Sequence, residues 1–380
     1  MILNFKETWA SASIAPVGEI GQDFSTGVNI ALQGAEVLLF LVCILFSVAF
    51  FTVAERKTLG YMQRRLGPNV IGYYGMLQAF ADAVKCLIKE IIIPKESNKA
   101  ILIIAPMITL ITGLLGWLVI PVGPSLTLGN LDNGILYSLA VGSIGIFGTL
   151  LSGWSSNSKY SFLGTIRSTA ALISYELILT TIYIICIMAI GTLNITLFIE
   201  YQRALWLLLP LFPLFIIFYI STVAETNRPP FDLVEAESEL VAGFFTEYSG
   251  SPFVFFFLAE YSNIILMCAA TTILFLGGYL YLPSVSICSD LMLNIFFGTD
   301  NQYSLLYHIL EGLIYGCNLA IKLIILMFTF IWVRASFPRF TYDNLIYLCW
   351  LIFLPLLFGV ILIVPVILYV YNGLPAGMLF

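Results

Sequence analysis

The sequence predicts an all-α polytopic membrane protein with about eight transmembrane helices and an amphipathic helix at the membrane interface. Of the 380 residues, 60% are hydrophobic and only 10% are charged. Apolar runs of about 18 or more residues recur along the chain, and each can cross the hydrocarbon core of a bilayer. The weaker alternation of apolar and polar residues that marks an outer-membrane barrel is missing from the sequence.

The predicted spans follow the apolar runs in chain order. We expect transmembrane helices over residues 35–54, 100–121, 134–154, 170–192, 204–224, 253–282, 306–333 and 345–371. Residues 1–34 precede them as an N-terminal extension, and residues 35–380 form a single membrane domain. The sixth and seventh runs are long enough to tilt or to extend beyond the lipid. Residues 283–304 between them make a long connection, in which we expect a short surface helix at 290–297.

The positive charges predict how the spans are oriented. Most of the 16 Lys and Arg residues lie in loops at one end of the spans. Because such loops stay on the inner side of a membrane, that side receives loops 55–99, 155–169, 225–252 and 334–344. The outer side keeps only Lys6 and Arg203, together with both chain termini.

The first inner loop contains a helical pattern of its own. A turn signal at Gly67–Pro68–Asn69 is followed by apolar residues at helical spacing from Met76 to Ile91, with charged residues between them. This pattern is typical of an amphipathic helix that lies in the membrane interface. A functional wall and a plain surface connector fit the pattern equally well.

An acidic stretch separates the fifth and sixth runs. Its carboxylates are Glu225, Asp232, Glu235, Glu237, Glu239 and Glu247. Crowded and partly desolvated carboxylates have raised pKa values, which would let some of them exchange protons near neutral pH. A solvated acidic loop between two helices is the alternative interpretation, and the residues alone leave both open.

Three further ionisable residues lie inside apolar runs, where a charge is costly. Glu176 lies in the fourth run, Glu260 in the sixth and Lys322 in the seventh. Such residues are functional candidates by default. The alternative is that they form buried ion pairs that fix how the helices pack.

Several classes of function find no support in the sequence. There is no Walker A motif and no dinucleotide-binding GxGxxG at a strand–helix junction, so we expect this chain to bind neither ATP nor NADH itself. The seven cysteines include no CxxC pair and His308 is the single histidine, so we expect no metal or iron–sulfur site. The basic residues do not line one face, which argues against nucleic acid. Residues 1–33 fit neither a signal peptide nor a transit peptide, so we expect synthesis where the protein is inserted.

Ten ordered motifs together resemble one family closely, from about residue 35 to the end. They lie at Glu55–Gln63, Arg65–Asn69, Gln78–Lys85, Gly153–Tyr160, Ile173–Glu176, Ala224–Asp232, Glu237–Phe244, Glu247–Tyr248, Phe257–Tyr261 and Arg334–Asp343. The chain is similar to the quinone-site membrane subunit of respiratory complex I, which is chain 1 of the mitochondrial NADH:ubiquinone oxidoreductase and the H subunit in bacteria.

The resemblance implies a core membrane subunit whose eight helices border a quinone tunnel. Two hydrophilic partner subunits would complete the tunnel, and one of them would hold the terminal iron–sulfur cluster. FMN and the iron–sulfur clusters would belong to partner subunits, and ubiquinone would be the substrate. The residues implied at the tunnel are Arg56, Arg65, Asp82, Arg228, Asp232, Arg334 and Arg339.

The resemblance also implies a line of ionisable residues that couples quinone reduction to proton translocation. It would lead from the quinone chamber toward antiporter-like membrane subunits. The members implied are Glu176, Glu225, Glu235, Glu237, Glu239, Glu247, Glu260 and Lys322, with Asp232 at the chamber end. No residue of this chain is implied as a catalytic residue or a metal ligand.

This sequence departs from the family pattern in three respects. The N-terminal extension and the 283–304 loop are longer than in many relatives, and we expect them to contact accessory subunits. Leu66 and Thr341 stand where some relatives carry a basic residue.

We expect a multi-pass protein of the mitochondrial inner membrane, in contact with lipid, with a bacterial cytoplasmic membrane as the alternative. A hydrogenase-like membrane anchor and an autonomous cation transporter using Glu176, Glu260 and Lys322 are the competing functions; the lack of an internal repeat argues against the transporter.

Overall fold

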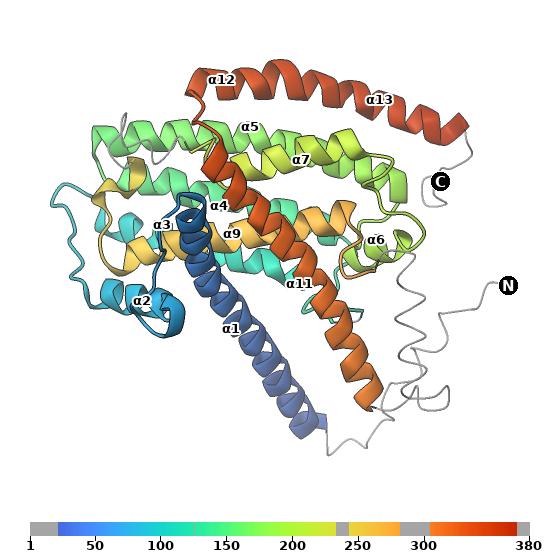
Figure 1. Cartoon of the computed structure of the whole chain (residues 1–380), viewed down its shortest axis with the longest axis horizontal. Coiled ribbons are helices and arrows are strands. Elements are labelled where there is room, and N and C mark those ends of the chain that lie inside the picture. Colours follow the sequence, from blue (N-terminus) through green and yellow to red (C-terminus); the bar gives the residue numbers. More distant parts are fainter. Residues whose placement is uncertain (1–21, 125, 233–242, 282–304, 371–380) are drawn as a thin grey trace. The chain divides into compact units, whose positions relative to one another are not determined.

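The computed structural model describes residues 22–124, 126–232, 243–281 and 305–370 (Figure 1). In these ranges every regular element is a helix, as the composition predicts. Seven of the described helices are long and apolar enough to cross a membrane, which confirms the predicted class of fold. The chain divides into two compact units, residues 1–44 and 45–380, and every residue of the candidate site belongs to the second.

The long helices correspond to seven of the eight predicted spans. They are α1 (Gln22–Met62), α3 (Lys99–Leu115), α4 (Gly134–Ser155), α5 (Lys159–Ile190), α9 (Ser251–Phe275), α11 (Leu305–Ser336) and the run of α12 (Tyr342–Tyr347), a π-helical turn (Leu348–Phe353) and α13 (Leu354–Val370). Shorter elements are η2 (Tyr73–Gly75), η3 (Gly116–Val119), α6 (Ile195–Tyr201) and η4 (Gly243–Glu247). Glu235, Glu237, Glu239 and the helix expected at 290–297 lie outside the described residues.

The fifth predicted span is shorter than expected. The sequence suggested a helix over residues 204–224, but α7 covers Phe212–Glu225, only 14 residues. Pro210 and Pro213 explain the difference, because proline cannot donate a backbone hydrogen bond and is accepted only in the first turn of a helix. Pro213 occupies such a first-turn position in α7. A helix of this length is about 21 Å long, less than the hydrocarbon core of about 30 Å.

Other helix ends also differ from those predicted. α9 ends at Phe275 rather than at 282, because Gly277 and Gly278 take positive φ angles of 69° and 51°, which end a helix. α1 continues past residue 54 to Met62, and α5 begins at Lys159 rather than at 170. The inner loops predicted at 55–99 and 155–169 are therefore shorter than the hydropathy suggested.

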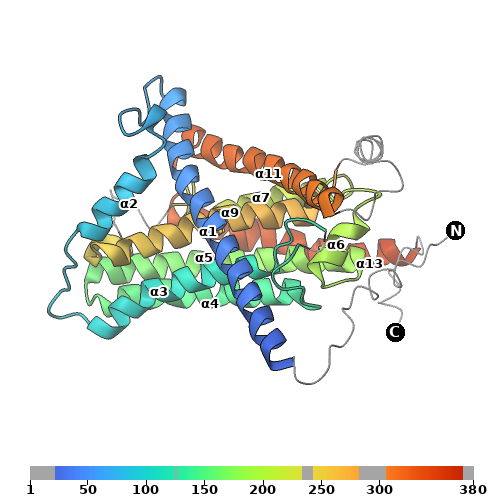
Figure 2. The ribbon, with the colours of Figure 1, turned by 90° about the horizontal axis from the view of Figure 1, so that it is seen from below.

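The helices of the second unit pack as a bundle (Figures 1 and 2). α3 packs against α4 and α9, and α5 packs against α4, α7 and α13. The end of the acidic stretch is held to this bundle by η4, which packs on α5. The approach is close, because a Cβ atom added to Gly164 would lie 2.8 Å from the Cα atom of Gly243. Phe244 and Phe245 of η4 then join Phe256 of α9 in a buried aromatic cluster.

The predicted amphipathic segment contains α2 (Gln78–Ile88). None of its residues is fully buried, and Leu87 and Ile88 are largely exposed. Phe80 attaches α2 to α1, since its ring centre lies 6.0 Å from that of Phe46 and 6.3 Å from that of Phe50. The helical part of the prediction is confirmed, while the position of α2 at a membrane interface stays a prediction.

Candidate functional site: a buried ion-pair cluster beside two cavities

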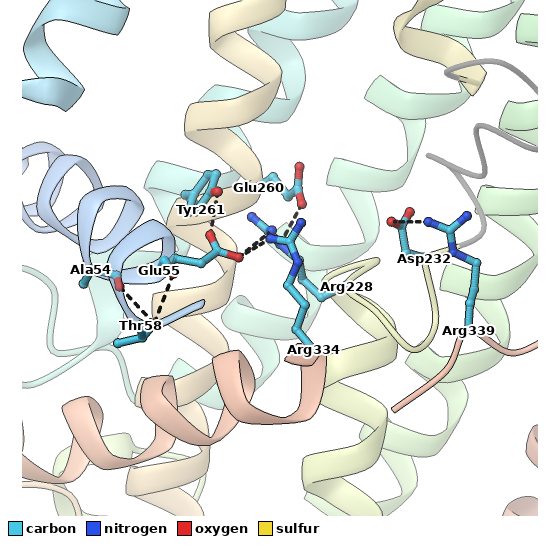
Figure 3. A network of polar contacts seen from close by, with 9 residues as sticks. All are labelled: Ala54, Glu55, Thr58, Arg228, Asp232, Glu260, Tyr261, Arg334 and Arg339. Carbon is cyan, nitrogen blue, oxygen red and sulfur yellow. Dashed lines mark hydrogen bonds and ion pairs between the residues drawn. The ribbon is translucent and has the colours of Figure 1, made fainter. Parts of the chain in front are cut away.

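Glu55 of α1 lies at the centre of a buried polar cluster (Figure 3). Its side chain is only 5% exposed, and its Oε1 atom accepts hydrogen bonds from Arg228, at 3.1 Å, and from Arg334. The hydroxyl of Tyr261 donates to its Oε2 atom at 2.7 Å. The donors come from the segment after α7 and from α9 and α11, so this carboxylate connects four parts of the chain.

Arg228 links Glu55 to a second carboxylate. Its Nε atom lies 3.0 Å from Oε1 of Glu260, and its guanidinium lies over the ring of Tyr261, 4.4 Å from the centroid. Burial alone would lower the pKa of Arg228, but the carboxylates of Glu260 and Glu55 outweigh burial and raise that pKa above its usual value. The guanidinium therefore stays charged. In the described part of the chain, the two carboxylates and two guanidinium groups of this cluster balance in charge, which lowers the cost of burying them.

A second ion pair lies next to the cluster (Figure 3). Nη2 of Arg339 is 3.3 Å from Oδ2 of the buried Asp232. The same two segments are also joined by Phe340, whose backbone N–H donates to the carbonyl of Pro230 at 2.9 Å and whose ring stacks on Phe231. The turn after α7 is thereby fixed to the connection between α11 and α12.

The remaining residues implied at the tunnel lie at the surface. Nη1 of Arg56 is 2.6 Å from Oδ2 of Asp82, and Gln78 donates to the other oxygen of that carboxylate. Arg65 donates to Gln63 at 2.8 Å. An exposed ion pair of this kind contributes little to stability, so its effect is to join α1 to α2. The structure thus brings Arg228 and Arg334 onto the same carboxylate, places Asp232 and Arg339 beside them, and leaves Arg56, Arg65 and Asp82 outside the buried cluster.

Two cavities lead away from the cluster between α3, α4, α5, α7 and α9. The larger, of about 150 Å³, is lined by Asp232, Glu260 and Glu225 among other residues. The smaller, of about 70 Å³, is lined by Glu225 and Glu176. Glu225 borders both cavities, and Gly116, Ser138, Gly142, Leu266 and Met267 also line both. Four of the predicted carboxylates therefore follow one another along a single pair of cavities.

Glu176 and Glu225, the two carboxylates at the smaller cavity, have few hydrogen-bond partners among the described residues. Glu176 accepts a hydrogen bond from the hydroxyl of Ser143 on α4. The Oε2 atom of Glu225 is buried and has no hydrogen-bond partner among the described residues. Burying an unpaired carboxylate oxygen is costly unless it is protonated or solvated.

Two predicted members of the coupling line lie apart from these cavities. Glu247 is the last residue of η4 and lines neither cavity. Lys322 of α11 points at the other end of α9, where its ammonium group contacts backbone carbonyls.

Several site residues were not singled out from the sequence. Glu55 was recognised as an acid at the inner end of the first apolar run but was not predicted as a site residue, and Tyr261 was noted only as part of a motif. The small residues of α3 and α4 were also missed. Gly113 of α3, Gly116 of η3, and Gly142 and Gly145 of α4 all line the larger cavity.

Comparison with known proteins places these features in a family. The sequence model of the family described as NADH dehydrogenase matches residues 35–365. The chain is 67% identical over 340 residues to NADH-ubiquinone oxidoreductase chain 1 of Yarrowia lipolytica, which covers 90% of this chain and 97% of that protein. It is 53% identical over 369 residues to the protein of the same name in Podospora anserina, covering 92% and 99%. The protein of that name in the alga Chondrus crispus is 44% identical over 340 residues, covering 90% and 98%.

Proposed function

The chain belongs to the family of NADH-ubiquinone oxidoreductase chain 1, a membrane subunit of that oxidoreductase, and we propose that in the complex it lines the quinone tunnel and provides the carboxylate path that couples quinone reduction to proton translocation. Ubiquinone is the substrate. FMN and the iron–sulfur clusters belong to partner subunits. The fungal relatives support a place in the mitochondrial inner membrane.

We infer the partners from two kinds of surface on the chain, an exposed charged end and exposed apolar helix faces. Hydrophilic subunits, including the one with the terminal iron–sulfur cluster, cover the end where Arg56, Arg65 and Asp82 are exposed. Antiporter-like membrane subunits take the protons onward, and lipid contacts the apolar helix faces. The many large apolar side chains exposed on the spanning helices support the membrane contacts.

The arginines supply the donors for the quinone side of the proposal. Arg334 and Arg339 each hold a buried carboxylate yet remain 34% and 40% exposed. Their outward N–H groups are available to the carbonyl oxygens of a quinone head group, which accept hydrogen bonds and gain negative charge during reduction. Asp82 and Arg56 at the surface, and Arg65 in the adjacent loop, would line the outer part of the tunnel.

We assign the transfer of protons to the carboxylates along the two cavities. Negative charge that develops on a quinone beside Arg334 and Arg339 alters the charge balance of the cluster and therefore the proton affinity of Glu260 and Asp232 at the first cavity. A cavity of about 150 Å³ lined by Asp232, Glu260 and Glu225 has room for several water molecules, which would carry a proton from the first two carboxylates to the third. Glu225 then exchanges with Glu176 across the second cavity. The single observation that carries this route is that Glu225 borders both cavities.

Replacement of Glu225 by glutamine tests the route. Glu225→Gln keeps the shape of the side chain but removes the group that gains and loses a proton. We expect the complex to assemble, and its proton-coupled quinone reductase turnover to fall by about tenfold or more, equivalent to about 1.4 kcal/mol in the barrier. The measurement is NADH oxidation by native membranes with a soluble quinone, together with proton uptake or release.

Two controls make this result specific. Glu90→Gln changes an exposed acid that lines neither cavity and should leave turnover unchanged. NADH oxidation by a hydrophilic acceptor that bypasses the quinone site should be normal in Glu225→Gln, which shows that the electron-input part is intact. Unchanged turnover and pumping in an assembled Glu225→Gln complex would disprove the route.

A further inference from the structure

The end of α9 lies among apolar helices, where its backbone carbonyls need partners. Helices that end in such surroundings leave their last carbonyls without intrahelical donors, and each unpaired group is costly. Here donors from the neighbouring segments supply them. Gln202 donates to the carbonyl of Ile273 at 2.8 Å, and the backbone N–H of Leu208 donates to Phe275 at 3.0 Å.

The carbonyls that follow α9 are bound by two side chains of α11, the helix beside it (Figures 1 and 2). Asn318 donates to the carbonyls of Tyr279 and Leu280, at 2.8 Å and 2.7 Å. One turn further along α11, the ammonium group of Lys322 donates to Leu276 at 2.7 Å, to Gly278 at 2.8 Å and to Leu280 at 2.5 Å.

The contacts of Lys322 use its full capacity as a donor. A lysine ammonium has three N–H groups and no acceptor, and three carbonyls take all three hydrogens. A deprotonated amine would have two hydrogens and would turn a lone pair toward the third carbonyl. The side chain is only 9% exposed, and its charge faces the negative end of α9 and lies 4.4 Å from the centre of the Trp206 ring. All of these contacts favour the charged form.

We propose that Lys322 is a positioning residue whose ammonium group fixes the end of α9 to α11 and so holds Glu260 and Tyr261 in the ion-pair cluster. Arg334 makes the second attachment, because it lies 12 residues further along α11, about 18 Å away, and binds the same carboxylate as Tyr261. Together, the two attachments fix the position of α9 along the axis of α11. This role differs from that of a proton carrier, and it holds whether or not protons follow the route proposed above.

Chemical rescue distinguishes a positioning ammonium from a proton carrier. In Lys322→Ala the three carbonyls lose their donor, and we expect quinone reductase turnover to fall by about tenfold to about 100-fold, the range that displacement of reacting groups by up to 1 Å produces. Methylammonium offers three N–H groups and should restore most of the lost turnover in native membranes. Tetramethylammonium has the charge but no donor, and imidazole titrates near neutral pH; neither should restore it.

Three further variants complete the test. Ile321→Ala alters an exposed side chain of the same helix turn and should leave turnover unchanged. Lys322→Arg keeps the charge but has a planar fork that cannot reach three converging carbonyls, so it should remain impaired. If Lys322→Ala does not assemble, Asn318→Leu removes two bonds to the same segment and should lower turnover in the same direction.

The outcomes distinguish a positioning role of Lys322 from a role as a proton carrier. Rescue by methylammonium but not by tetramethylammonium or imidazole supports the positioning role. Rescue by imidazole would overturn it in favour of a proton carrier, and normal turnover in Lys322→Met, which lacks both charge and donors, would overturn it altogether. Equal rescue by tetramethylammonium would also overturn it, because charge alone would then suffice.

Discussion

At the scale of single residues, Glu55 determines whether the cluster can stay buried. It accepts hydrogen bonds from two arginines and one tyrosine, and Glu260 is the other carboxylate bound by Arg228 in the described part of the chain. Glu55→Gln would leave two guanidinium groups beside one carboxylate. Removal of one partner from a buried ion pair costs about 3–5 kcal/mol because the remaining charge is uncompensated.

We therefore expect Glu55→Gln to lower the amount of assembled complex and its melting temperature in mild detergent. Tyr261→Phe removes only the hydroxyl that donates to Glu55 and keeps the ring under Arg228, so it should cost less, about 1.5–3 kcal/mol for a bond to a charged group. Thr58→Val is the matched control, since the hydroxyl of Thr58, one turn further along α1, bonds only backbone carbonyls. A Glu55→Gln complex as stable as the Thr58→Val complex would contradict the assigned role.

At the scale of helices, glycines on α3 and α4 leave space that the proposed proton route would need. Gly142 lines both cavities, and a Cβ atom added to it would have no neighbour within 4 Å. The first side-chain atom therefore meets no clash, and a larger side chain would extend into the cavities. Glycine inside a helix is also unfavourable by about 1 kcal/mol relative to a good helix former, so a substitution there should not destabilise α4.

Gly142→Leu should therefore separate stability from coupling. We expect the assembled complex to be at least as stable as the wild type, while its proton-coupled turnover falls because the connection between Glu260 and Glu225 is filled. Gly359→Leu in α13 is the matched control, because that glycine is also free of neighbours within 4 Å and lines neither cavity. If Gly142→Leu retained full turnover and pumping, the cavities would not be part of the proton route.

The helix boundaries show which structural features can be predicted from the local sequence. Hydropathy alone located the long helices, because a run of about 20 apolar residues has few other stable arrangements. It failed where backbone chemistry takes precedence, at Pro210 before α7, at Pro213 in the first turn of α7, and at Gly277–Gly278 after α9. All four residues were visible in the sequence, so these ends were predictable in principle from proline and glycine positions.

At the scale of the whole molecule, the site depends on contacts that no spacing in the sequence determines. The motifs contain Glu55, Arg228 and Arg334, but Glu55 lies 173 residues from Arg228 and 279 from Arg334. Only the packed bundle brings them together. Likewise, nothing in the sequence around Lys322 indicates that its neighbours are backbone carbonyls, because these become available only when α9 ends early.

The ion pair between Asp232 and Arg339 offers a test of such a long-range contact. The two residues are 107 positions apart and join the turn after α7 to the connection after α11. We expect Asp232→Asn and Arg339→Gln each to lower the melting temperature of the isolated complex, and the double variant to lose less than the sum of the two. For charged groups in contact, the interaction energy from such a cycle is about 0.5–3 kcal/mol.

Activity in the same variants then distinguishes attachment from chemistry. Asp232 lines the larger cavity, whereas Arg339 does not, so Asp232→Asn should lower proton-coupled turnover more than its effect on stability would explain. A second substitution that restores the stability of the Arg339→Gln complex should restore its turnover only in part. The exposed guanidinium of Arg339, a proposed quinone contact, would still be missing. Strictly additive losses in the double variant would show that the two segments are held together by Phe231, Phe340 and the backbone bond to Pro230, and not by this ion pair.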